Sequence, residues 1–147
     1  MSEHRATVEW QRSGEFRYET YSRSHILKFG EIAVPGSAAP ANIPPTAAGG
    51  PGVDPEQAFV ASLSACHMLW FLHLACRQNW VVERYVDEAV GVLDKTWISR
   101  VTLRPAVSFS GRSPTEEEHA ALHHRAHEKC FIANSVKTEV IVEPCLK

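Results

Sequence analysis

A run of twenty residues, 57–76, contains no Asp, Glu, Lys or Arg. About twenty apolar residues are enough to cross a membrane as a helix. The run is interrupted by Ser62, Ser64, His67 and His73, and no cluster of Lys or Arg flanks it to mark a cytoplasmic side. We therefore predict a central helix buried inside a soluble domain or dimer, and no membrane partner.

The signals for where helices begin are strong. Asp54 is a suitable N-cap, Pro55 fits the first helical position, and Gln57 stands where a capping box needs Glu or Gln. These residues predict a helix over 54–79 with Cys66 in its middle. A second helix is predicted over 113–130, because Ser or Thr caps it and the carboxylates of 116–118 meet the positive end of its dipole.

The remaining segments indicate β-structure and one connector. Residues 35–53 are rich in Pro, Ala and Gly and uncharged, which predicts a long connector that is either a lid or an insertion. Alternating or apolar runs predict strands over 6–34 (at 6–10, 16–21 and 26–29), 80–109 and 137–143. The order βββ–α–βββ–α–β defines an α+β class in one domain spanning 1–147.

The charge and the cysteine content limit the classes of function that the protein can have. The formal net charge is −2, from 15 basic and 17 acidic residues without a basic stripe, so we expect no nucleic-acid partner. The first residues are polar and show no secretory signal, which predicts a cytoplasmic protein. Its four cysteines should then stay reduced, and any disulfide would be transient or catalytic.

Cys66 is open to two interpretations. Its neighbours at helical spacing are uncharged, and an apolar environment raises the pKa of a thiol, so Cys66 is either inert core or is activated by a cation from elsewhere in the fold. Cys130 follows the second helix in a segment that must turn. A fixed thiol with a mobile one is what a peroxide reductase needs, because the first becomes a sulfenic acid and the second closes a disulfide with it.

Two segments, 54–66 (DPEQAFVASLSAC) and 126–136 (AHEKCFIANSV), resemble the two active-site motifs of the OsmC/Ohr family of hydroperoxide reductases. The resemblance implies an intertwined homodimer in which antiparallel sheets wrap around two central helices. It implies that Cys66 is the peroxidatic thiol and Cys130 the resolving one, that organic hydroperoxides are the substrates in defence against oxidative stress, and that no cofactor is needed. The reductant would be a dithiol, which is a lipoylated protein in the best-understood branch.

The same resemblance implies a catalytic Glu and Arg. Glu56 matches the Glu, and it lies ten residues before Cys66, about 15 Å along a helix axis, so the two would meet only across a dimer. Arg23 is the preferred arginine, because OsmC-type members supply it from the strand before the connector. Arg12 matches the position used in the Ohr branch and is the alternative.

Some features depart from the family. His67 replaces an aromatic residue after Cys66, and Phe131 replaces a Pro after Cys130, which indicates a less characterised branch. His123 and His127 are spaced i, i+4 and, with Cys130, are compatible with a metal site. A non-enzymatic protein that binds a metal there, or an apolar ligand at the dimer interface, is therefore the alternative function.

Overall fold

The computed structural model describes residues 1–47 and 49–146. Its helices and strands, in chain order, are β1 (Thr7–Glu9), β2 (His25–Phe29), β3 (Ile32–Gly36), the 3-10 helix η1 (Pro40–Asn42), α1 (Pro55–Arg77), β4 (Val81–Asp87), β5 (Val90–Asp94), β6 (Trp97–Leu103), β7 (Pro105–Ser110), α2 (Glu116–Lys129), the 3-10 helix η2 (Ala133–Ser135), β8 (Glu139–Val142) and β9 (Cys145–Leu146). The α+β class is confirmed. The chain divides into two compact units, Met1–Ala58 and Phe59–Lys147.

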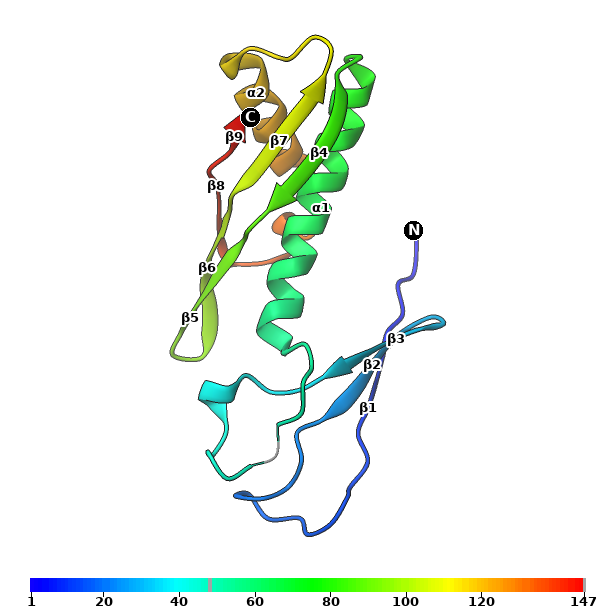
Figure 1. Cartoon of the computed structure of the whole chain (residues 1–147), viewed down its shortest axis with the longest axis vertical. Helices are drawn as coiled ribbons and strands as arrows, with labels where there is room; N and C mark the ends of the chain where they lie inside the picture. Colours follow the sequence, from blue (N-terminus) through cyan, green and yellow to red (C-terminus); the bar gives the residue numbers. More distant parts are fainter. Residues whose placement is uncertain (48, 147) are drawn as a thin grey trace. The chain divides into compact units, whose positions relative to one another are not determined.

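The first unit contains the antiparallel sheet β1-β2-β3 (Figure 1). Strands β2 and β3 form a hairpin at Gly30, whose φ of 62° favours glycine. The strand predicted at 16–21 is wrong. This segment forms a turn in which the Tyr21 N–H donates to the carbonyl of Arg17 at 2.9 Å. The aromatic side chains of this segment do not line a face of a sheet. Phe16 and Tyr21 instead pack with Trp10 in an aromatic cluster.

The predicted connector 35–53 is closed at its base. Gly36 and Val53 form a parallel bridge, and the Ser37 N–H donates to the Val53 carbonyl at 3.1 Å. The capping box at the start of α1 is confirmed, because the Gln57 N–H donates to Asp54 Oδ1 at 2.7 Å and the Asp54 N–H donates to Gln57 Oε1 at 3.2 Å. The described part of the connector is thus a closed loop that leads directly into a capped helix.

The second unit has two three-stranded sheets, β4-β7-β9 and β5-β6-β8. Strands β8 and β9 pair in parallel with β6 and β7, whereas the other strand pairs of this unit are antiparallel. The chain returns through α2 before these strands, and such a crossover permits parallel pairing. The short strand β9 was not predicted, and the last predicted strand is shorter, at Glu139–Val142.

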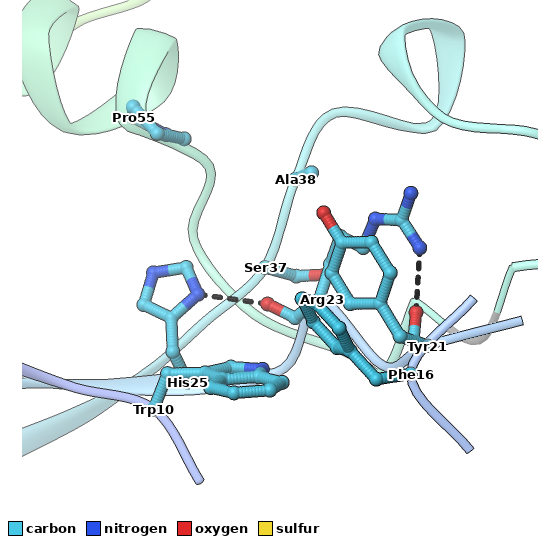
Figure 2. A pocket seen from close by; sticks show the side chains of 8 residues that line it. All are labelled: Trp10, Phe16, Tyr21, Arg23, His25, Ser37, Ala38 and Pro55. Carbon is cyan, nitrogen blue, oxygen red and sulfur yellow. Dashed lines mark hydrogen bonds between the residues drawn. The ribbon is translucent and has the colours of Figure 1, made fainter. Parts of the chain in front are cut away.

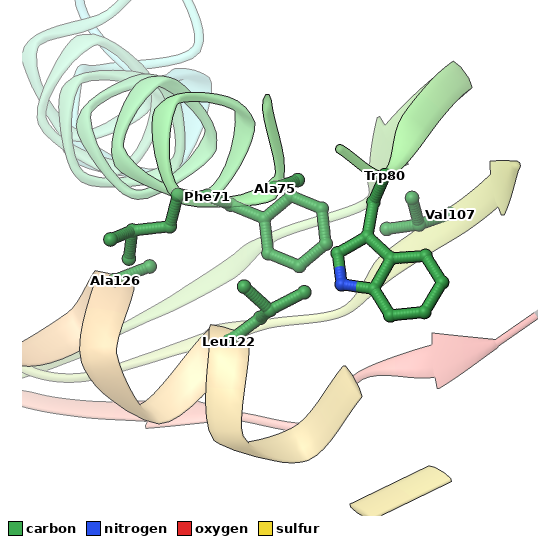
Figure 3. Close-up of a cluster of buried hydrophobic side chains, with 7 residues drawn as sticks. Phe71, Ala75, Trp80, Val107, Leu122 and Ala126 are labelled. Carbon is green, nitrogen blue, oxygen red and sulfur yellow. The ribbon is translucent and has the colours of Figure 1, made fainter. Parts of the chain in front are cut away.

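Within this unit, α1 runs along strands β4 and β7, and α2 packs beside it (Figure 1). The core between them is apolar (Figure 3) and consists of Phe71, Leu74, Ala75, Trp80, Val107, Leu122 and Ala126. Helix α2 begins with a complete capping box, in which Thr115 Oγ1 accepts from the Glu118 N–H at 3.2 Å. These contacts fix the two helices that carry Cys66 and Cys130.

Helix α1 is only partly covered by its own chain. By length and composition alone it qualifies as a membrane span. Its buried positions lie on one face (Leu63, His67, Phe71, Leu74 and Ala75). On another side Leu69 is 63% exposed, so a single chain does not bury the whole surface of this helix.

Candidate active site

The structure brings Cys66 and Cys130 together. Cys66 lies on α1 and is half-buried, whereas Cys130 directly follows α2 and is 2% exposed. Burial raises the pKa of the Cys130 thiol to about 11, and the neighbouring Cys66 thiol contributes to the rise. The two thiols are 64 residues apart in sequence and meet in the second unit without a disulfide.

Local structure holds Cys130 in place. It is the C-cap residue of α2, and its N–H donates to the carbonyl of His127 at 3.1 Å. Its Sγ accepts a hydrogen bond from the N–H of Ala133, at the start of η2, at 3.4 Å. The thiol therefore sits where α2 ends, and the first residue of η2 donates a hydrogen bond to it.

A pocket of about 300 Å³ opens beside Cys66. It is lined by Leu69, Trp70, His73 and Phe131 in addition to Cys66, and most of this lining is apolar. The Trp70 ring meets Phe131 edge to face at a centroid distance of 5.4 Å. Trp70, one helical turn after Cys66, thus forms a wall of the pocket.

One cation of the same unit lies at this wall. Lys129 Nζ is 5.5 Å from the centre of the Trp70 ring. It is the last residue of α2 and precedes Cys130. The sequence gave no reason to single it out, because a lysine at the end of a helix is ordinary.

Four histidines gather where α1 and α2 meet. His67 Nε2 is 3.0 Å from His123 Nδ1, and His123 Nε2 is 3.2 Å from His119 Nε2. Burial is the main cause that lowers the pKa of His67 to about 4 and of His123 to about 3. His127 is near enough to lower the pKa of His67 further. At neutral pH the hydrogen-bonded rings of His67, His123 and His119 are uncharged. Each hydrogen bond between two rings therefore joins the N–H group of one ring to a nitrogen lone pair of the other.

The arrangement of these histidines bears on the alternative function, in which the region of His123, His127 and Cys130 binds a metal. The ring nitrogens of His67, His123 and His119 point at one another instead of at a common centre. Among residues 1–47 and 49–146, no three His, Cys, Asp or Glu side chains have a geometry that would hold a metal ion. Of the pair His123 and His127, interpreted from sequence as possible ligands, His123 is hydrogen-bonded to His67 and His119. His127 Nδ1 is buried and has no hydrogen-bond partner among the described residues.

Arg23 is held in the first unit, where it is 9% exposed. Its guanidinium donates to the carbonyl of Tyr21 at 2.6 Å and of Tyr18 at 2.8 Å, and lies 3.4 Å from the centre of the Tyr21 ring. It lines a pocket of about 360 Å³ (Figure 2), whose other walls are Trp10, Phe16, Tyr21, His25, Ser37, Ala38 and Pro55. Among the residues that the structure describes, Arg12 bonds only to the carbonyl of Gly14, and it is exposed.

Glu56 lies in the first turn of α1, in the same unit as Arg23. Its Oε1 accepts from Asn42 Nδ2 at 3.3 Å, while its Oε2 is buried and has no hydrogen-bond partner among the described residues. No ion pair joins Glu56 to Arg23 within the described chain. A buried carboxylate oxygen without a partner costs free energy.

Comparison with known proteins assigns the class. A family model described as OsmC-like protein matches residues 48–144. An OsmC-like protein of unknown function from Vibrio cholerae is 47% identical over 99% of this chain and 100% of its own, with a TM-score of 0.92. The chain belongs to the OsmC-like family.

More distant structures share the fold alone. An organic hydroperoxide resistance protein OsmC from Legionella pneumophila is 20% identical with a TM-score of 0.65, covering 100% of this chain and 99% of its own. OhrB of Bacillus subtilis, an organic hydroperoxide resistance protein, is 22% identical with a TM-score of 0.60, covering 97% of this chain and 98% of its own. No curated protein matches the sequence.

Proposed function

We propose that this protein is a thiol-dependent peroxidase that reduces organic hydroperoxides in the cytoplasm. One observation carries the proposal: a half-buried thiol that lines an apolar pocket has, as its neighbour, a fully buried thiol from a distant part of the sequence. Support also comes from the family and from the hydroperoxide-resistance proteins that share its fold. The pocket of about 300 Å³ is large enough for the alkyl or aryl group of a hydroperoxide.

The environments of the two thiols suggest their roles. With a pKa of about 11, Cys130 is almost entirely protonated at neutral pH and is a poor first nucleophile. Cys66 lines the pocket and is accessible to substrate. We assign the first attack to Cys66 and the second step to Cys130.

The reaction has two chemical steps and one reduction. The Cys66 thiolate attacks the distal oxygen of ROOH, the O–O bond breaks, and the departing alkoxide takes up a proton to give ROH. Cys66 is then a sulfenic acid. The Cys130 thiol displaces its hydroxyl as water and forms the Cys66–Cys130 disulfide. A dithiol, for which a lipoylated protein is our candidate, reduces this disulfide and becomes a cyclic disulfide itself.

Arg23 and Glu56 would complete the site from a second subunit. The Arg23 guanidinium is buried and already oriented by two carbonyls, so it would stay charged in a dry site and stabilise a thiolate. Glu56 keeps a buried carboxylate oxygen free for such a group. A homodimer would also cover apolar side chains that one chain leaves exposed, including Leu69, Phe131 and Phe16.

The proposal is tested by the peroxide preference of the wild-type protein. With dihydrolipoamide as the reductant, we expect cumene hydroperoxide to be consumed at least about tenfold faster than hydrogen peroxide, since burying about 60 Å² of apolar surface contributes about 1.5 kcal/mol. Stopped-flow measurement at pH 7 gives both rates. Consumption no faster than in a protein-free control would contradict the proposal.

The shared site is tested by complementation. We expect homodimers of Cys66→Ser and of Arg23→Ala each to be inactive, because each lacks one half of every site. Co-expressed heterodimers should regain about half of the wild-type activity per dimer, since one complete site remains across the interface. Arg12→Ala is the matched control and should stay active. Heterodimers as inactive as both parents would exclude an arginine supplied by the partner.

A further inference from the structure

A single hydrogen bond between side chains joins α1 to α2 among the described residues. It links His67 Nε2 and His123 Nδ1 at 3.0 Å, and the two ring planes are 2° apart. Both side chains are almost fully buried, at 1% and 2% exposure. Water therefore has no access to replace the bond, and its loss would leave a polar atom unpaired in the core.

On α2, the ring of His123 is held in a fixed position by two further contacts. The ring of His123 stacks on Phe71 at a centroid distance of 4.2 Å. Its other nitrogen is held by His119 at 3.2 Å. His123 thus presents Nδ1 in a fixed direction, and His67 has to align with it.

The bond joins the helix that carries Cys66 to the helix that ends just before Cys130. His67 directly follows Cys66 on α1. On α2, His123 precedes Cys130 by two helical turns, and His127 between them accepts the Cys130 N–H through its carbonyl. A shift of one helix along the other changes the His67–His123 distance and the distance between the sulfurs together.

We propose that His67 and His123 are positioning residues for disulfide closure, which hold Cys130 facing Cys66. The proposal rests on the proposed function. In this step the S–O bond of the Cys66 sulfenic acid breaks, the S–S bond forms, and the Cys130 proton leaves with the hydroxyl as water. A disulfide tolerates only a narrow range of Cα separations and dihedral angles, so small helix displacements slow its formation.

The test separates the two chemical steps. Rapid-quench mass spectrometry with dimedone follows the Cys66 sulfenic acid and the disulfide after addition of cumene hydroperoxide. In His67→Leu we expect sulfenic acid formation within about twofold of wild type and closure slowed at least about tenfold, by loss of alignment. His67→Gln places an amide where Nε2 was and should restore closure to within about threefold. The matched control is His124→Leu, at an exposed position on α2. This variant should form the disulfide at the wild-type rate.

A second variant keeps the proposal falsifiable if His67→Leu does not fold. His123→Phe removes the same bond from the α2 side and retains an aromatic ring against Phe71. The single variants and the double variant should slow closure by the same factor, because all three lack one shared bond. Closure at the wild-type rate in either single variant, or equal slowing of both chemical steps, would overturn the positioning role. Absence of both the sulfenic acid and the disulfide in wild type would instead refute the proposed function, and this proposal with it.

Discussion

Replacing Cys66 with serine should abolish hydroperoxide reduction, with kcat/KM falling by at least about a thousandfold. The serine hydroxyl is a far weaker nucleophile than a thiolate. Cys130 is unable to take over, because a thiol with a pKa of about 11 is ionised in only about one molecule in ten thousand at pH 7. Steady-state peroxide consumption with dihydrolipoamide measures the loss.

The matched control is Cys76→Ser, on the same helix. Cys76 is exposed and lies ten residues beyond Cys66, so its replacement should leave kcat/KM within about twofold of wild type. A Cys66→Ser variant that retained a tenth of the activity would show that another thiol or group carries the reaction. Equal losses in both serine variants would point to a folding defect common to the helix.

The second large effect is on stability in acid. His67 and His123 are buried and uncharged, with pKa values of about 4 and about 3, below the value of about 6.5 in an unfolded chain. Between these limits the unfolded state binds protons that the folded state does not, so stability decreases as the pH falls. Each histidine contributes a slope of about 1.4 kcal/mol per pH unit inside its window.

From pH 7.5 to pH 5 we expect the free energy of unfolding to fall by about 2–4 kcal/mol, a large part of the stability of an ordinary domain. Urea unfolding at fixed protein concentration measures this change in the free energy of unfolding. The lowered pKa of Glu9, caused by Lys28, acts at lower pH and does not overlap with this window. His67→Gln should reduce the slope, while His124→Gln should not. A urea midpoint unchanged over this range would contradict buried neutral histidines.

Local signals in the sequence predicted much of the architecture. Asp54 with Gln57, and Thr115 with Glu118, define where α1 and α2 begin, because capping depends only on neighbouring residues. The error at 16–21 arose because aromatic alternation looks the same in a strand and in a turn that packs a local aromatic cluster. The parallel partners of β8 and β9 depend on how the chain crosses over, which no local pattern records.

The candidate site was only partly predictable. The resemblance of two segments, and not periodicity, placed Cys66 with Cys130, and the structure supports that pairing. Histidines at i, i+4 on α2 are compatible with a metal site. Sequence spacing contains no information on whether their nitrogens converge on an ion or on His67 of another helix. The buried unpaired oxygen of Glu56 was likewise visible only in three dimensions.

The central claim is that Cys66 and Cys130 work as one redox pair. Peptide mass mapping without reduction, after a single equivalent of cumene hydroperoxide, tests it most directly. We predict that the chain loses a pair of hydrogens and that one peptide containing Cys66 becomes cross-linked to one containing Cys130, while Cys76 and Cys145 remain free for alkylation. Oxidised protein in which Cys66 and Cys130 both remain alkylatable, or in which the bond involves another cysteine, would contradict it.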